Sequence, residues 1–325
     1  MKIIGLGNAL VDVLIQLPDE SIIQKLKLPK GSMQLIQNAE IPSINDHINS
    51  LSAILLSGGS AANTIHGLAK LGTKCGFIGK VGKDEYGDFY ENDLKNAGVV
   101  SSLYRSKTDT GRAYTFITPD SERTFATYLG AAIELMDNDL NRDMFKGYDV
   151  LHVEGYLVQN RKLIETSFKL AKELSIKVSL DLASYNVVEA NRDFLSKMIP
   201  EYVDIVFANE EEAKAYTGKS PMDSLIEISN QCEIAIVKIG KDGSLIKTLN
   251  NVYKIAATTS NVLDTTGAGD QFAAGFLHGL IEHQEVEQCG KLGALLAGYV
   301  ISNYGARIPE NQWPMIEEKM QRIMD

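Results

Sequence analysis

Short apolar runs suited to β-strands alternate with segments of helical spacing from one end of this 325-residue sequence to the other. Around Ile164, Phe168 and Ala171, apolar residues recur on one side of a helix. The run from Ile234 to Val237 is apolar at every position, as in a parallel strand buried on both faces. This alternation predicts an α/β fold: one domain, residues 1–325, with a mostly parallel sheet that helices cover on both faces. The strand-like runs are Lys2–Leu6, Ile54–Leu56, Cys75–Ile78, Val150–Val153, Val178–Leu182, Ile205–Ala208 and Ile234–Ile239.

Two regions depart from this rhythm, roughly residues 10–36 and 103–128. Polar and apolar residues alternate in both, most clearly from Arg112 to Ile117 after Thr110-Gly111. A period of two is typical of strands with one exposed face, so we expect a small antiparallel sheet that projects from the main domain. Such a sheet could act as a lid over a ligand at the ends of the main strands, or be a hairpin without a role in function.

Composition and charge exclude several classes of protein. With 44% hydrophobic residues, a chain of this length buries a large core, unlike a disordered segment or a disulfide-rich miniprotein. The net charge is -10 and there is no long basic run, so we expect no nucleic-acid partner. Without a run of ~18 apolar residues or a signal-peptide pattern, we expect no membrane association and a cytoplasmic location. Three cysteines far apart, Cys75, Cys232 and Cys289, are typical of buried thiols in a reducing compartment.

The most informative segment is Asp264-Thr265-Thr266-Gly267-Ala268-Gly269-Asp270. After it, Phe272, Phe276 and Leu280 recur on one helical face, which places the two glycines at a helix start. The N–H groups and the positive end of the helix dipole there favour a phosphate, and more strongly as charge builds during transfer. Asp270 can accept a proton from a hydroxyl nucleophile; alternatively, it only balances the helix dipole.

This segment resembles the C-terminal signature of the PfkB family of carbohydrate and nucleoside kinases, which have the ribokinase-like fold. Far upstream, Gly58-Gly59-Ser60-Ala61-Ala62-Asn63-Thr64, followed by residues 79–87, resembles the N-terminal signature of the same family. The two signatures occur in the family's order. The two regions of alternating polar and apolar residues lie where the family has its lid. The resemblance implies a kinase that uses ATP and Mg²⁺, with Gly267, Ala268 and Gly269 as its anion hole and Asp270 as its base.

The start of the chain, Gly5 to Asp12, resembles the first strand and the substrate-binding aspartate of adenosine kinases and their bacterial relatives. The resemblance implies that Asp12 accepts hydrogen bonds from two vicinal hydroxyls, as a carboxylate can. Gly58 and Gly59 would let the acceptor approach the backbone, and Asn63 would offer it both a donor and an acceptor. The alternatives are an ordinary strand-end turn at Asp12 and a solvated helix residue at Asn63.

The segment from Asn209 to Glu212 resembles the family's NxxE motif. Its spacing places Asn209 and Glu212 about one helical turn apart, on the same side of a helix start. The resemblance implies that both act on the magnesium and phosphate network, Glu212 through water because Mg²⁺ keeps much of its hydration shell. The alternative, an acidic first turn that complements the helix dipole, fits Glu210 and Glu211.

Two further segments resemble parts of the family's nucleotide site. Lys238, Gly240 and Gly243 belong to a glycine-containing turn that follows a strand, where backbone can meet adenine, ribose or phosphate. By the same resemblance Asn303 approaches the adenine, although Asn303 could equally cap the end of the preceding helix.

Cations are implied on both sides of the anion site. By resemblance, Asp264 and Thr266 join the carbonyls around Gly305-Ala306 at a site for a monovalent cation, with K⁺ as the candidate. Arg112, in the predicted lid, would stabilise the transferring phosphate, and Arg123 is a weaker candidate for the same role. The alternative for both arginines is a solvated surface.

The motifs and the family resemblance together imply a kinase that transfers the γ-phosphoryl group of ATP to a primary hydroxyl of a nucleoside or sugar, and the resemblance to adenosine kinases makes adenosine the first candidate acceptor. Phe116, Phe125, Tyr128 and Tyr156 could stack on a base or belong to the core. A ribokinase- or fructokinase-like sugar kinase and a non-catalytic nucleoside or sugar sensor remain alternatives. The exposed edge of the lid sheet could pair with a second subunit, so a monomer and a homodimer both remain open. A sugar-phosphate acceptor is a further alternative, which would need a cationic pocket. The candidates for that pocket are Arg105, Lys107, Arg112 and Arg123.

Overall fold

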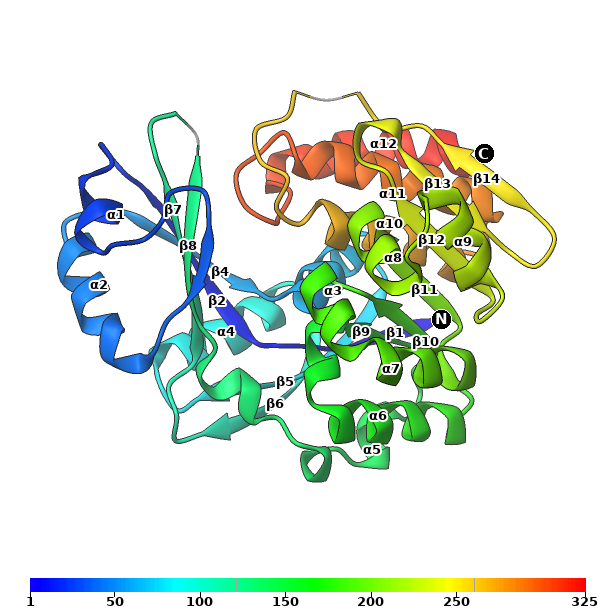
Figure 1. Ribbon diagram of the computed structural model, residues 1–325, viewed down its shortest axis with the longest axis horizontal. Coiled ribbons are helices and arrows are strands. Elements are labelled where there is room, and N and C mark those ends of the chain that lie inside the picture. Colours follow the sequence, from blue (N-terminus) through cyan, green and yellow to red (C-terminus); the bar gives the residue numbers. More distant parts are fainter. Residues whose placement is uncertain (121, 260) are drawn as a thin grey trace.

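The computed structural model describes residues 1–120, 122–259 and 261–325. Its main body is a nine-stranded sheet in the order β14-β13-β12-β11-β10-β9-β1-β5-β6 (Figure 1). Each pair of neighbouring strands from β12 to β6 in this order is parallel. β13 is antiparallel to both of its neighbours, β12 and β14. The mostly parallel sheet expected from the sequence is therefore confirmed. The strands are β1 (Lys2–Leu6), β5 (Lys74–Gly82), β6 (Val100–Ser106), β9 (Val150–Glu154), β10 (Lys177–Asp181), β11 (Ile205–Asn209), β12 (Ile234–Lys238), β13 (Ser244–Lys247) and β14 (Val252–Ile255).

Helices cover both faces of this sheet, and each face has its own buried cluster of apolar side chains. Successive strand residues point to opposite faces, so Ile3 of β1 joins one cluster and Ile4 the other. On the first face lie α3 (Ser60–Lys70), α4 (Glu85–Asn96), α10 (Ala268–Ile281), α11 (Val286–Val300) and α12 (Trp313–Met324). On the second lie α5 (Arg142–Phe145), α6 (Arg161–Glu173), α7 (Tyr185–Tyr202), α8 (Glu210–Thr217) and α9 (Pro221–Ser229).

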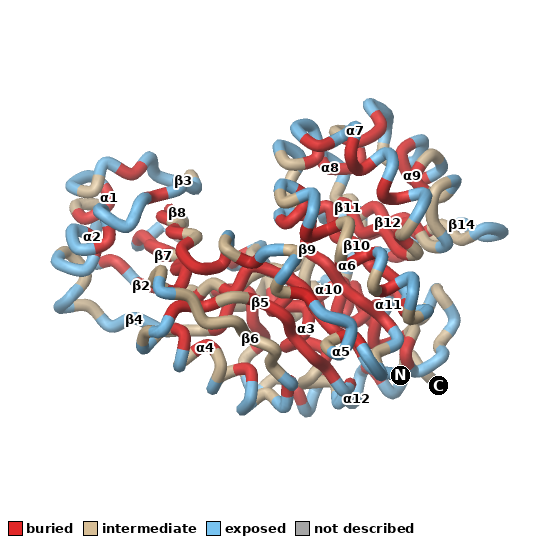
Figure 2. Tube along the Cα trace, turned by 90° about the horizontal axis from the view of Figure 1, so that it is seen from below, coloured by how far each residue is buried: buried red, intermediate tan, exposed pale blue. Residues whose placement is uncertain are grey.

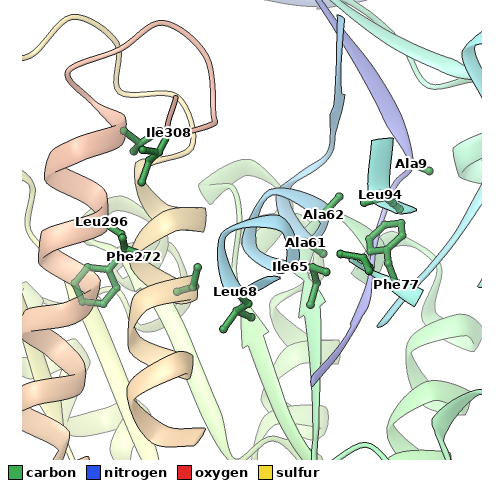
Figure 3. Packing of buried hydrophobic residues seen from close by; sticks show 14 of the residues in the cluster. Ala9, Ala61, Ala62, Ile65, Leu68, Phe77, Leu94, Phe272, Leu296 and Ile308 are labelled. Atoms are coloured by element: carbon green, nitrogen blue, oxygen red, sulfur yellow. The ribbon is translucent and has the colours of Figure 1, made fainter. Parts of the chain in front are cut away.

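The packing of α3 links the sheet to the C-terminal helices. Ala61 and Ile65 point toward Phe77 of β5, while Leu68 lies on the side of α10 and its Phe272 (Figure 3). Small residues let these elements approach closely: a Cβ at Gly67 of α3 would lie 2.9 Å from the Cβ of Ala274 in α10. This close contact holds α3 against α10.

A second sheet projects from the main body, in the order β3-β8-β7-β2-β4, with α1 (Ser21–Lys25) and α2 (Ile41–Ile48) on one side (Figures 1 and 2). Its strands are β2 (Leu10–Gln16), β3 (Met33–Leu35), β4 (Ala53–Gly58), β7 (Gly111–Ile117) and β8 (Arg123–Tyr128). The predicted small lid sheet is thus present.

Three details of the lid differ from the expectation. The lid sheet is mixed rather than antiparallel, because β2 and β7 continue from the parallel strands β1 and β6 and therefore pair in parallel. The run at Ile54–Leu56 belongs to lid strand β4 and not to the main sheet. The second lid segment begins at Gly111, since residues 103–106 still form part of β6 in the main sheet. No helix within the described residues is long and apolar enough to cross a membrane.

Candidate active site

The start of α10 lies where the glycine motif predicts a helix start. Gly267 is its N-cap with φ 73°, a conformation that favours glycine. A Cβ at this position would also lie 2.6 Å from the Cα of Ala306, so a side chain has no room. The first-turn N–H groups and the helix dipole make this end attractive to an anion.

Asp270 stands in the first turn of α10 and is held by two residues of α3. Ser60 Oγ donates to Asp270 Oδ1 at 2.7 Å, and Asn63 Nδ2 donates to Oδ2 at 3.0 Å. Burial raises the pKa of Asp270 to about 6, although these two hydrogen bonds act in the opposite direction. A carboxylate with this pKa is ionised near neutral pH and can still take up a proton.

Asp12 of β2 is a second carboxylate near Asp270. Burial raises its pKa to about 7; the positive charge of Arg307 lowers it and the negative charge of Asp270 raises it. Gly58, at the end of β4, leaves room for it: a Cβ there would lie 2.3 Å from Asp12 Cγ. Gly59 has φ 96° and caps α3, so the chain turns sharply from lid to helix at this point.

Glu154, at the end of β9, is a residue that our sequence analysis missed. Its carboxylate is buried and accepts hydrogen bonds from Asn8 N, Asn8 Nδ2 and Ala61 N at 3.0, 2.6 and 3.0 Å. Burial raises its pKa to about 7 despite these bonds. Glu154 therefore ties the β1–β2 connection to the start of α3, and so positions Asp12 relative to the α3 residues that hold Asp270.

A buried charge cluster lies beside the anion site. Lys238, at the end of β12, donates to Asp181 Oδ2 at 2.9 Å; Asp181 ends β10 and was also missed. A Cβ at Gly269 would lie 2.9 Å from Lys238 Nζ, which places the ammonium beside the α10 start. The pKa of Glu212 is raised to about 7, first by burial and then by the charge of Asp181, while Lys238 lowers it.

Asn209 and Glu212 form a reciprocal cap at the start of α8. Asn209 N and Nδ2 donate to the Glu212 carboxylate at 2.8 and 2.7 Å, and Glu212 N donates to Asn209 Oδ1 at 2.8 Å. Their direct hydrogen bonds are thus those of a capped helix start, as in the alternative interpretation. Both residues also line a large cavity. Their position is compatible with contact to a hydrated Mg²⁺ through water.

A cavity of about 940 Å³ brings most of the predicted nucleotide residues together. Ala294, Ala297 and Gly298 of α11, with Phe272 of α10, give it an apolar wall that suits a flat base. Ser60 and Asp181 line it without having been predicted as site residues, and Tyr156, named as a residue that could stack on a base, lines it as well. The predicted site residues in its lining are Asn209, Glu212, Lys238, Gly240, Gly243, Thr266, Gly267, Ala268, Gly269 and Asp270.

The remaining predicted residues do not belong to the described lining of this cavity. Asn303 donates to the carbonyl of Tyr299 at 2.8 Å and to Gln312 Oε1 at 3.2 Å, which matches the helix-capping alternative. Arg112 is buried in the lid, over the ring of Tyr86 at 4.7 Å. The other predicted residues lie on neighbouring segments. Asp12 belongs to β2, and Gly58 and Gly59 stand where β4 meets α3. Asn63 belongs to α3, and Asp264 lies in the turn before α10.

Replacing Lys238 by methionine is expected to cost about 3 kcal/mol of unfolding free energy at pH 8, because it leaves Asp181 and Glu212 buried without their cation. The pKa of Glu212, already raised to about 7, would then lie further above its unfolded value, so the loss should shrink as the pH falls and Glu212 takes up a proton. Urea unfolding at pH 6 and pH 8 measures this difference. Lys177→Met, which removes an exposed pair with Glu233, should change stability by less than about 1 kcal/mol. An equal loss at both pH values would contradict the prediction.

The parallel sheet, the projecting lid and the glycine-flanked carboxylate at a helix start define a ribokinase-like phosphotransferase. The chain belongs to the pfkB family of carbohydrate kinases, whose model matches residues 32–313. It is therefore a kinase that binds ATP and acts on an alcohol group.

Individual relatives carry different names. The chain is 30% identical to a 5-dehydro-2-deoxygluconokinase of Halalkalibacterium halodurans over 279 residues, 80% of this chain and 83% of that protein. Its structure matches that of a probable sugar kinase from Rhizobium etli with a TM-score of 0.86 and 31% identity. It matches the adenosine kinase of Sinorhizobium meliloti with a TM-score of 0.85 and 32% identity; each comparison covers 98% of both chains.

Proposed function

We propose that this protein is an ATP- and Mg²⁺-dependent kinase that phosphorylates the primary hydroxyl of a neutral acceptor, with adenosine as the first candidate. The observation that carries the proposal is the position of Asp270. It lines the large cavity at the anion-binding helix start and also bonds Asn63, whose helix begins at the lid. The base thus stands between a nucleotide cavity and the residues assigned to the acceptor.

The charges around Asp12 support a neutral acceptor. Burial raises the pKa values of Asp12, Glu154 and Asp270, and the charge of Asp270 raises those of Asp12 and Glu154 further, so an ionised group is costly in this region. The nearby guanidinium of Arg307 is paired with Asp93 at 2.7 Å. A gluconate derivative or a sugar phosphate would bring further negative charge to these carboxylates.

Three of the four cations that could form a sugar-phosphate pocket have carboxylate partners. Arg105 pairs with Asp88 and Glu91, Arg112 with Asp109, and Arg123 with Asp264. A free sugar is the second candidate, because an uncharged sugar meets the same electrostatic condition and the relatives include proteins named sugar kinases. The likeness to the S. meliloti adenosine kinase, over nearly the whole of both chains, supports adenosine first.

In the proposed reaction, the acceptor oxygen attacks the γ-phosphorus of ATP in line with the bond to the β–γ bridging oxygen. That bond breaks, ADP leaves, and the hydroxyl proton passes to the Asp270 carboxylate. The N–H groups at residues 267–269 and the Lys238 ammonium beside them stabilise the charge on the transferring phosphoryl group. Mg²⁺, when bound with ATP, neutralises phosphate charge, and Asn209, Glu212 and Asp181 offer oxygen atoms to its water ligands. The lid limits access of water to the reacting groups.

The test is coupled ADP release with Mg-ATP across adenosine, other nucleosides, ribose, fructose, gluconate derivatives and hexose phosphates. Selective turnover of adenosine supports the proposal. Selective turnover of ribose or fructose retains the neutral acceptor and replaces the nucleoside, whereas turnover of an acid or a phosphate refutes the electrostatic argument. If no acceptor is turned over but adenosine binds in calorimetry, a sensor role takes the place of the kinase.

The pH profile follows from two raised pKa values. Asp270 must be ionised to accept a proton, and Asp12 accepts hydrogen bonds through both oxygens only when ionised. We therefore expect kcat/KM for the acceptor to fall about tenfold per pH unit below pH 7, the pKa of Asp12, and more steeply below pH 6, that of Asp270. Rates between pH 5 and pH 9 at constant ionic strength measure this profile. A plateau that extends down to pH 5 would contradict it.

A further inference from the structure

Three segments meet at the buried carboxylate of Asp264. Thr266 N donates to its Oδ1 at 2.6 Å and Gly305 N donates to its Oδ2 at 2.8 Å. The first bond shapes the turn that leads into Gly267, and the second fixes the loop that continues to Ala306, against which Gly267 packs. Asp264 thus holds together both sides of the backbone that presents the anion site.

The positive charge that balances this carboxylate comes from the lid. Arg123, the first residue of β8, reaches across to the main domain, and its guanidinium contacts both Asp264 Oδ1 and Thr266 Oγ1. The side chain of Asp264 is only 1% exposed. A nearby cation therefore has a large effect on the free energy of this carboxylate in the folded protein. The guanidinium also lies 5.7 Å from the centre of the Phe125 ring, which helps to fix its direction.

These contacts do not fit the monovalent-cation site that the family resemblance implies. Arg123 and two backbone N–H groups already use the Asp264 carboxylate, and the carbonyl of Ala306 accepts a hydrogen bond from Gln271 Nε2 at 3.1 Å. A K⁺ ion placed between Asp264 and Thr266 would stand next to a guanidinium and be repelled by it. The expected K⁺ ligands are therefore engaged with the protein itself.

We propose that Arg123 is the built-in cation of this site, so that the kinase needs no K⁺ and the lid supplies the charge that organises the anion hole. Arg123 is a positioning residue: it acts through Asp264 and Thr266 on the backbone at residues 267–269. The inference rests on the proposed kinase reaction for its activity readout, but its prediction about cation binding requires no acceptor.

The test compares the wild type, Arg123→Ala and Arg123→Lys in KCl, NaCl and N-methylglucamine chloride at equal ionic strength. The wild type should release ADP at the same rate in all three salts, within about twofold. Arg123→Ala should be at least about tenfold slower in N-methylglucamine and should recover in KCl more than in NaCl, because the vacated site can then bind an ion. Arg123→Lys, which keeps the charge, should remain independent of K⁺. Lys30→Ala, which removes a lid cation paired with Glu20 and Asp120, is the matched control and should show no selective response to K⁺.

Thermal unfolding in the same three salts tests the site without turnover. A rise in the Tm of Arg123→Ala that is specific to KCl, absent from the wild type, would support the proposal even if the acceptor were wrongly assigned. Strong stimulation of the wild type by K⁺ would overturn it. So would an Arg123→Ala variant that keeps full activity, or one whose lost activity no alkali cation restores, since a direct contact with phosphate or a purely mechanical lid role would explain those results instead.

Discussion

Replacing Asp270 by asparagine is expected to lower kcat by about 10³ while the acceptor still binds, because the variant cannot take the hydroxyl proton. The local structure should survive the change. Ser60 can still donate to the carbonyl oxygen of the substituted side chain, and Asn63 Oδ1, buried without a partner among the described residues, can accept from the new amide after a turn of the Asn63 side chain. ADP release and calorimetric binding of the acceptor measure the two effects separately.

Stability provides a control for the same variant. Burial raises the folded-state pKa of Asp270 above its ordinary value, so the ionised carboxylate lowers stability at pH values above about 6. Asp270→Asn removes this charge, and its Tm at pH 8 should be no lower than that of the wild type. Asp143→Asn, on the exposed surface of α5, should leave both kcat and binding unchanged. Turnover by Asp270→Asn within about tenfold of the wild type would show that Asp270 is not the base.

The parts of the site that could be predicted from the sequence are those whose geometry is local. The run from Asp264 to Asp270 encodes a turn, an N-cap and a first helical turn within seven residues, and the structure places all of them as expected. The predicted pair Asn209 and Glu212 likewise meets within one helix start. Such contacts depend on spacing along the chain, and spacing is visible in a sequence.

Glu154 and Asp181 show what was missed and why. Each is a carboxylate at the last residue of a buried strand, and neither belongs to a short motif. Their partners, Asn8 and Ala61 for one and Lys238 for the other, are far away in the sequence. A usable signal existed nevertheless, because the carboxyl ends of parallel strands meet at one edge of the sheet, where ligands bind in such folds.

The lid arginines show a different limit. Sequence alone favoured Arg112 over Arg123 as the residue near the phosphate. In the structure, the Arg112 guanidinium lies near the rings of Tyr86 and Tyr128, whereas Arg123 pairs with Asp264. Arg112 belongs to β7 and Arg123 to β8, which pair in antiparallel. The two arginines lie at opposite ends of this strand pair: Arg112 is opposite Tyr128 and Arg123 is opposite Ile117. Which end faces the main domain depends on the mixed order of the lid sheet, and that order was not predicted.

Gly59→Ala is expected to destabilise the protein by about 3 kcal/mol and to abolish detectable kinase activity. At φ 96° a side chain is strained, and its Cβ would lie 2.1 Å from the carbonyl oxygen of Asn8. Relief of this collision must move either Asn8, which Glu154 holds, or the start of α3, which carries the Ser60 and Asn63 side chains that bind Asp270. Either movement separates the base from the acceptor residues.

Gly72→Ala is the matched control, because Gly72 has a similar φ of 81° but a Cβ there would meet no atom within 4 Å. Its cost should be limited to backbone strain, about 1 kcal/mol, and its activity should be normal. Urea unfolding and ADP release of the two variants therefore separate the effect of conformation from that of the collision. If Gly59→Ala lost no more stability than Gly72→Ala and kept its activity, the close approach of the β4–α3 turn to Asn8 would not be needed to align Asp12 with Asp270.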